Sequence, residues 1–135
     1  MTDNVARVRQ WLEVLGRGEF EEWDDIVADD LMMHIVAMPG DNHPVIGRDA
    51  NRARALQVWK SWRYFAFHDV EAHAAADDPD VVFVIARAEA ETVWGANYSN
   101  LYSLRLRLRD GLIHEHVEFF DPAVVMKVFK DHLGQ

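Results

Sequence analysis

The sequence predicts an α+β domain in which N-terminal helices pack on a curved, mostly antiparallel sheet. Three observations predict this fold class. Apolar residues recur at helical spacing in the first half of the chain, and from Tyr64 onward they recur at every second residue. Four strand candidates then follow one another with no helix between them, which excludes a βαβ series. The length of 135 residues suits a single domain over 1–135.

The first half contains three helix candidates. The first carries an apolar stripe from Val5 to Leu15 and ends at Gly16 and Gly18, because glycine commonly follows the last turn of a helix. A short second helix directs apolar residues inward and acidic residues outward. The third begins near Asp49, a good N-cap residue. Its apolar stripe is Ala55, Val58, Trp59 and Trp62.

The strand candidates begin with LMMHIVAM (31–38), which precedes the third helix. A Pro/Gly-rich segment, MPGDNHPVIG (38–47), follows it, and we expect this segment to form a loop at the mouth of a site. The later strand candidates span 64–74, 81–91, 97–109 and 112–120. In the third of these, leucines alternate with arginines, so one face lies on a core. A final helix starts at Pro122.

Composition excludes several classes of protein. The formal net charge of −9 argues against a nucleic-acid surface. The absence of cysteine excludes disulfides, thiolate nucleophiles and cysteine-bound zinc. No apolar run reaches the roughly 20 residues that span a bilayer, and the N-terminal segment lacks the apolar core of a signal peptide. We therefore expect a cytoplasmic protein without nucleic-acid or membrane partners.

Three segments of the sequence stand out, namely GRDA (47–50), the Asp29-Asp30 pair, and RDGLIHEHVEFFDP (109–122). Together they resemble the SnoaL-like family of the nuclear transport factor 2-like superfamily, and within it the phenazine biosynthesis A/B proteins most closely. The shared pattern is an asparagine and a tyrosine on one strand, an Asx-Gly turn, an isoleucine, an acidic residue and a proline before the last helix. Asn100, Tyr102, Ile113 and Glu118 fit that pattern.

The resemblance implies a cone-shaped fold that encloses a small-molecule cavity, and it implies a homodimer. It also implies that an acid on the last strand, here Glu118, works in the cavity. Tyr98 matches a cavity tyrosine of some phenazine A/B proteins, and Arg48 falls near a histidine of that family. A carboxyl held among bulky apolar neighbours suits general acid/base chemistry. The alternative for Glu118 is a surface glutamate paired with Arg105.

Whether Glu118 faces the cavity depends on the turn between the last two strands. A two-residue turn at Asp110-Gly111 places Glu118 opposite Ser103, on the arginine face. A three-residue loop places it opposite Tyr102, on the leucine face. We favour the three-residue loop because the resemblance requires a buried acid. A bulge further along the strand would serve equally well.

Other candidate residues each have a structural alternative. His34 and His116 are candidates for assisting Glu118 in proton transfer, or for hydrogen bonding inside the core. Tyr98, Asn100 and Tyr102 share one strand face, as substrate-binding groups or as core residues with polar tips. Three residues complete the expected substrate-binding set, namely Trp59, Trp62 and Arg48. Most of the aromatic residues are expected in the core.

A metal site is a weaker alternative. His114, His116 and Glu118 alternate along one strand, but three such ligands span about 13 Å, too far to meet one ion. We therefore expect no metal. No nucleotide-binding glycine pattern or serine nucleophile motif occurs, so we also expect no cofactor.

The combined expectation is a small-molecule enzyme that transfers protons without a cofactor. Its substrate is a small apolar or aromatic carbonyl compound that undergoes isomerisation, cyclisation or condensation. Two alternatives remain open, because this fold hosts many functions: a non-catalytic ligand-binding protein, and a hydrolase of epoxides or esters.

Overall fold

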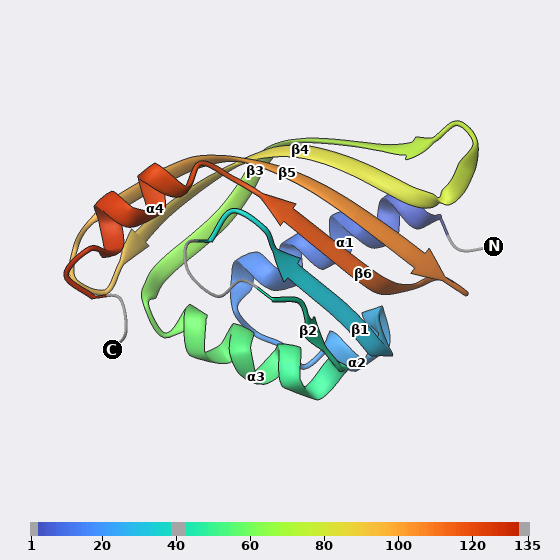
Figure 1. Cartoon of the computed structure of the whole chain (residues 1–135), viewed down its shortest axis with the longest axis horizontal. Coiled ribbons are helices and arrows are strands. Elements are labelled where there is room, and N and C mark those ends of the chain that lie inside the picture. Colours follow the sequence, from blue (N-terminus) through green and yellow to red (C-terminus); the bar gives the residue numbers. More distant parts are fainter. Residues whose placement is uncertain (1–2, 39–42, 133–135) are drawn as a thin grey trace.

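A computed structural model describes residues 3–38 and 43–132, which form helices packed on one face of a strongly bent sheet (Figure 1). The predicted α+β class, with N-terminal helices on a curved sheet, is confirmed. The elements are α1 (Asn4–Arg17), α2 (Trp23–Ile26), β1 (Val27–Ile35), β2 (Val45–Ile46), α3 (Arg48–Trp59), β3 (Trp62–Ala75), β4 (Asp78–Thr92), β5 (Asn97–Arg109), β6 (Leu112–Phe119) and α4 (Pro122–Phe129).

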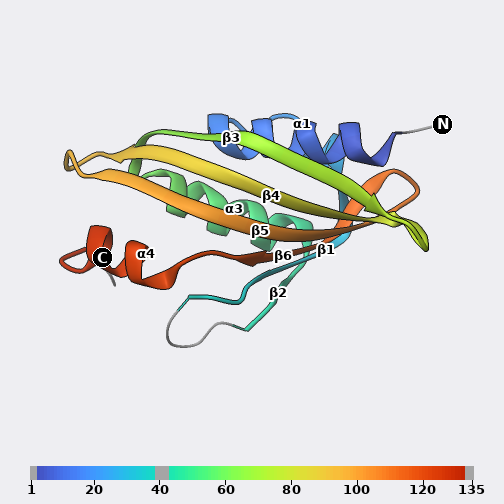
Figure 2. The ribbon, with the colours of Figure 1, turned by 90° about the horizontal axis from the view of Figure 1, so that it is seen from above.

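The six strands form one sheet in the order β2-β1-β6-β5-β4-β3. All neighbouring pairs are antiparallel except β1 and β6, which run parallel. Figure 2 shows α1 lying along the edge strand β3, with α4 at the far end of the sheet. The helices lie on the concave face, and within residues 3–38 and 43–132 no helix covers the outer face of the long strands (Figure 1).

Helix α1 continues through Gly16 and ends at Arg17, so only Gly18 of the two predicted glycines ends it. Gly18 caps the helix with a φ of 68°, a left-handed conformation that glycine adopts without strain. A Cβ at this position would also lie 2.4 Å from Cδ1 of Trp59. Gly18 thus ends α1 and lets α3 pack against it.

Several element boundaries differ from the sequence-based prediction. Helix α3 begins at Arg48 with Gly47 as its N-cap, so Asp49 lies in the first turn and is not the cap. Trp62, expected on that helix, is the first residue of β3. The first strand begins four residues early, at Val27, because the chain leaves α2 directly into the sheet.

The core lies between α1, α2 and the strands, and it holds the apolar side chains of β4 and β5 on their concave face. Residues on β5 alternate between buried and exposed along almost the whole strand. The predicted alternation of leucines and arginines is therefore confirmed, with Leu104, Leu106 and Leu108 on the core side. No helix in the described part of the chain combines the length and apolar character needed to cross a bilayer.

Candidate functional site

A cavity of about 440 Å³ opens between the concave face of the sheet and the helices α3 and α4. Its lining is mostly aromatic and aliphatic, with few polar groups. The aromatic residues are Trp59, Trp62, Phe65, Phe67, Tyr98, Tyr102, Phe120 and Phe129. The polar ones are His43, Asn51, Arg54, Ser61 and Glu118. An apolar pocket of this size with a small polar set is typical of a site for one small molecule.

Glu118 faces this cavity because of a bulge in β6. The turn between β5 and β6 has two residues, Asp110 and Gly111, which both have positive φ, and Arg109 pairs with Leu112. The predicted three-residue loop is therefore wrong. The register shifts between Arg107 and Leu108, where β6 carries one extra residue. Glu118 consequently pairs with Leu104 on the core face. The bulge, which the sequence analysis left open, decides the orientation of the acid.

The carboxylate of Glu118 is held by a chain of hydrogen bonds that starts on α1. Nε1 of Trp11 donates to Nδ1 of His116 at 2.9 Å, and Nε2 of His116 lies 2.9 Å from Oε1 of Glu118. An indole N–H is only a donor, so Nδ1 of His116 must accept, and its proton must sit on Nε2. His116 is therefore the neutral imidazole that donates to Glu118.

Burial differs sharply along this chain. The side chain of His116 is 0% exposed, whereas that of Glu118 is 14% exposed. Oε2 of Glu118 accepts no hydrogen bond from the residues that the structure describes, and so it can accept a proton from a ligand. Both ring nitrogens of His116 have protein partners, and no group of three or more acids or histidines in the described ranges could hold a metal ion.

Two tyrosines lie beside the acid in the same cavity. The hydroxyls of Tyr98 and Tyr102 are 2.6 Å apart, and Nδ2 of Asn100 donates to the Tyr98 hydroxyl at 2.9 Å. One phenolic hydrogen is used between the two tyrosines, which leaves the other for a ligand oxygen. Burial raises the pKa of both hydroxyls, and the charge of Glu118 raises them further, so both remain protonated donors at neutral pH.

Arg54 brings a positive charge to the cavity from α3. Its Nη2 donates to Oδ1 of Asn51 at 3.2 Å. Asn51 is fully buried, and its amide nitrogen donates to main-chain oxygens of β1 and of the β2–α3 region. Burial lowers the pKa of Arg54, while the charge of Glu118 acts in the opposite direction. The asparagine thus fixes the helix to the sheet and holds the guanidinium.

The structure gathers most of the predicted site residues in one place. Glu118, Tyr98, Tyr102, Trp59 and Trp62 line the cavity. His116 lies behind Glu118 and reaches the cavity only through it. Asn100 lies behind the tyrosines, and besides Tyr98 it binds the main chain at Asp121.

Two predicted residues lie elsewhere. In the parallel β1–β6 pair, Met33 stands beside His116 and Ile35 beside Glu118, so His34 points to the opposite face of the sheet. His34 therefore does not face the same side of the sheet as Glu118, and it is not among the residues that line the cavity. Arg48 lies outside the cavity lining, with its Nε 3.3 Å from Asp24.

A sequence model of the SnoaL-like domain matches residues 8–116, about four fifths of the chain. The chain belongs to the SnoaL-like family. No curated protein matches the sequence. For this SnoaL-like protein, function therefore has to be argued from the site.

Solved structures agree with this SnoaL-like fold. A candidate isomerase from Bacillus subtilis is similar with a TM-score of 0.86, 17% identity and full coverage of both chains. A phenazine biosynthesis-related protein from Pseudomonas aeruginosa has a TM-score of 0.77 and 16% identity over 98% of this chain and 84% of its own. A nuclear transport factor 2-like protein from Anabaena variabilis has a TM-score of 0.73 and 18% identity over 87% and 90%. Identities this low establish the fold only.

Sequence reasoning missed three groups of this SnoaL-like site. Trp11 looked like one more apolar residue of a helix stripe, since its partner His116 is 105 residues away. Arg54 lies outside the predicted apolar stripe of its helix, so the stripe does not indicate its place in the cavity. His43 lies in the Pro/Gly-rich segment, which was expected at the mouth of a site. His43 and Met38 both line the cavity, whereas residues 39–42 lie outside the described ranges.

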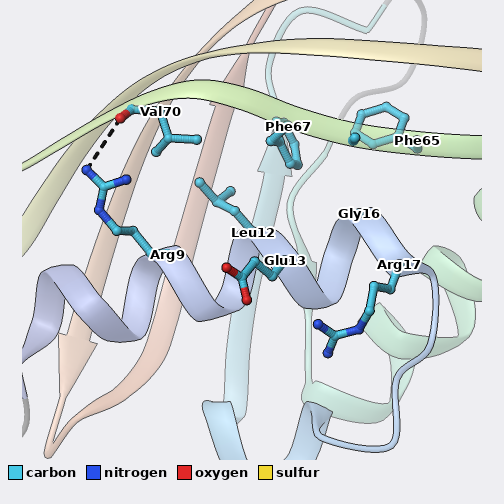
Figure 3. Close-up of a pocket in the computed structure, with 9 residues that line it drawn as sticks. Arg9, Leu12, Glu13, Gly16, Arg17, Phe65, Phe67 and Val70 are labelled. Carbon is cyan, nitrogen blue, oxygen red and sulfur yellow. Dashed lines mark hydrogen bonds between the residues drawn. The ribbon is translucent and has the colours of Figure 1, made fainter.

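A second hollow of about 360 Å³ lies between α1 and the edge strand β3 (Figure 3). Its rim carries charged side chains of α1, and Nη2 of Arg9 donates to the main-chain oxygen of Val70 at 3.3 Å. Phe65 and Phe67 line both this hollow and the main cavity. The two aromatic residues therefore form the wall between them.

Proposed function

We propose that this SnoaL-like protein is an enzyme that transfers protons on a small apolar or aromatic carbonyl compound, with Glu118 as the general base. One observation carries the proposal: a carboxylate stands in an apolar cavity, fixed by a buried histidine and beside two protonated tyrosines. A candidate isomerase from Bacillus subtilis shares this fold, and that likeness supports the proposal at the level of the fold.

The proposed step begins with Oε2 of Glu118 taking a proton from the carbon next to the substrate carbonyl. The C–H bond breaks, an O–H bond forms on Glu118, and the electron pair moves to the carbonyl oxygen as an enolate. The free phenolic hydrogen of the Tyr98–Tyr102 pair donates to that oxygen as its charge develops. Glu118 then returns the proton to the same carbon or to a conjugated one, and return to a conjugated carbon is an isomerisation.

His116 acts as a positioning residue in this proposal. Its Nε2–H bond to Oε1 orients the carboxylate, so that Oε2 is the oxygen presented to the substrate. Trp11 keeps the imidazole in the tautomer that can donate this bond. The aromatic walls exclude water around the carboxylate, which strengthens each polar interaction with the substrate.

The direct test is hydrogen–deuterium exchange at the acidic CH₂ of 2-tetralone, a bicyclic aromatic ketone, followed by NMR in D₂O. The wild-type protein is expected to accelerate exchange over buffer. Glu118→Gln is expected to lower the rate by about 10²–10⁴-fold, the usual worth of a positioned acid/base. The matched control is Glu115→Gln, the same change on the outer face of the same strand, where Glu115 pairs with Arg107.

Two results would contradict the catalytic proposal. One is exchange no faster than in buffer with the wild-type protein, and the other is exchange that survives Glu118→Gln. Tight binding of the ketone without exchange would instead favour the non-catalytic ligand-binding protein.

We also propose that the protein works as a homodimer through the outer face of its sheet. Phe83, Ile85, Leu101 and Phe119 are each 43–52% exposed there. The strand register brings them to neighbouring positions on β4, β5 and β6. Sedimentation velocity is expected to show a dimer for the wild type and a monomer for Leu101→Glu; a monomeric wild type would contradict the proposal.

A further inference from the structure

Arg54 is a charged group in the cavity that the proposed proton transfer leaves unused. Two other arginines of α3 are compensated at the surface, since Arg48 and Arg52 lie 3.3 Å and 2.8 Å from Oδ1 of Asp24. Arg54 instead has the neutral oxygen of Asn51 as its hydrogen-bond partner. Within the ranges that the structure describes, no carboxylate approaches its guanidinium to ion-pair distance.

Burial works against the positive charge of Arg54, and the charge of Glu118 offsets this effect only in part. The side chain is partly buried beside an aromatic wall, where a cation loses hydration. Asn51 cannot compensate the charge, and it is itself fixed by main-chain oxygens. A guanidinium held on one side by a rigid amide presents its remaining N–H groups as a planar fork, a geometry that matches a carboxylate.

The two charges of the cavity stand on different walls. Arg54 lies on α3, in the helical wall of the cavity, whereas Glu118 lies on β6, in the wall formed by the sheet. An anionic group on a ligand is attracted to Arg54 and repelled by Glu118. A ligand with a carboxylate at one end is therefore oriented with its other end toward Glu118 and the tyrosine pair.

We infer that the substrate is an aromatic keto acid whose carboxylate binds Arg54 while its carbonyl faces Tyr98 and Tyr102. This inference rests on the proposed function of the same site and names its substrate class. The chain carries a formal net charge of −9, so its overall field disfavours anions. A preference for an anionic ligand must therefore arise locally.

The test compares two probes of the same shape, 2-naphthoate and its neutral amide 2-naphthamide, by titration calorimetry. Wild-type protein is expected to bind the naphthoate about tenfold or more tightly than the amide, because a charge-assisted bidentate contact replaces a neutral one. Arg54→Met is expected to remove this preference. Arg54→Gln, which can still donate to Asn51, serves as a second variant with intact local contacts.

Arg52→Met is the matched control, because it removes the same charge from the same helix outside the cavity. It is expected to retain the preference for naphthoate. Equal affinity of wild-type protein for the two probes, weak or strong, would overturn the inference. So would a preference that persists in Arg54→Met and Arg54→Gln.

Failure of this inference and failure of the proposed function give different results. If the naphthoate preference depends on Arg54 but Glu118→Gln leaves 2-tetralone exchange unchanged, the anion site stands and the catalytic proposal falls. If Glu118→Gln abolishes exchange but both probes bind equally, the base stands and the keto acid class falls.

Discussion

Large apolar side chains cover both ends of the concave face of the sheet, but they are fully buried at one end, whereas several are only partly buried at the other. At one end α1 and α2 close over the strands, and Trp11, Trp23, Ile26 and Leu31 are 0% exposed. At the other end α3 and α4 leave a cavity, and Trp59, Trp62 and Phe67 are only partly buried around it. Aromatic residues thus form the core where the helices contact the sheet, and they form the wall of the cavity where the helices stand away from the sheet.

Strand β6 runs from the end covered by α1 and α2 to the end that holds the cavity, and Glu118 lies where these two regions meet. His116 is enclosed under Trp11, and two residues later Glu118 reaches the cavity. A carboxylate entirely in the core would meet no substrate, and one in bulk water would be neither oriented nor shielded. The boundary gives the acid a rigid partner on one side and a ligand space on the other.

The largest expected effect is on the free energy of unfolding, when one tryptophan at each end of the concave face is replaced by alanine. Trp11→Ala removes a fully buried indole and should lower the free energy of unfolding by about 3–5 kcal/mol. Trp62→Ala removes a partly exposed side chain at the cavity and should cost less than half as much. Urea unfolding followed by circular dichroism measures both. Equal losses would mean that the end that holds the cavity is packed as tightly as the end covered by α1 and α2.

A milder change at the boundary separates packing from hydrogen bonding. Trp11→Phe keeps an aromatic ring but removes the donor to Nδ1 of His116, and leaving that buried nitrogen unpaired should cost about 1–3 kcal/mol. In ¹⁵N NMR spectra, His116 of the wild type should show a protonated Nε2 and an unprotonated Nδ1. Trp11→Phe should lose this fixed pattern, whereas a pattern unchanged by the substitution would contradict the role given to Trp11.

The tyrosine pair predicts how stability depends on alkaline pH. Burial raises the pKa of Tyr98 and Tyr102 in the folded protein, so their contribution to stability is complete below the unfolded value of about 10 and is lost as the pH rises above it. Chemical unfolding at a series of alkaline pH values should show this fall. The double variant Tyr98→Phe/Tyr102→Phe should show a shallower fall, and an equal slope would contradict the burial of the hydroxyls.

The smallest effect is expected far from the cavity, at the ion pair of Asp30 and Arg109. The two side chains meet at 2.6 Å but are 54% and 49% exposed. The hydrogen bond from Arg109 lowers the pKa of Asp30, so any stabilisation exists above the unfolded value of about 4 and is lost as the pH falls. At neutral pH, Asp30→Asn should leave the urea midpoint unchanged within error, because solvent screens exposed pairs.

The fold could be predicted from the sequence because its signals are local and repeated. The alternation from Tyr98 to Leu108 determines which face of β5 is buried, and Gly18 ends α1 through its own backbone geometry. Each of these patterns is readable within one element. The order of the elements then leaves the helices only one face of the sheet to cover.

The site was less predictable because its decisive features join distant segments. The bulge at His114 reverses the orientation of everything after it on β6, yet the local sequence still alternates as a regular strand does. The face on which His34 lies depends on the parallel pairing of β1 with β6, which the sequence of β1 does not specify. The hydrogen bond between Trp11 and His116 joins residues that are 105 positions apart in the sequence, so no local sequence pattern indicates it.

The most direct measurement for this account is a crystal structure with 2-naphthol bound, since this planar phenol imitates the enol of 2-tetralone. The ring is expected in the cavity between Trp59 and Tyr102, with its oxygen in hydrogen-bond contact with the tyrosine pair and its neighbouring carbon facing Oε2 of Glu118. A ring bound elsewhere, or an oxygen directed away from both tyrosines, would contradict the account.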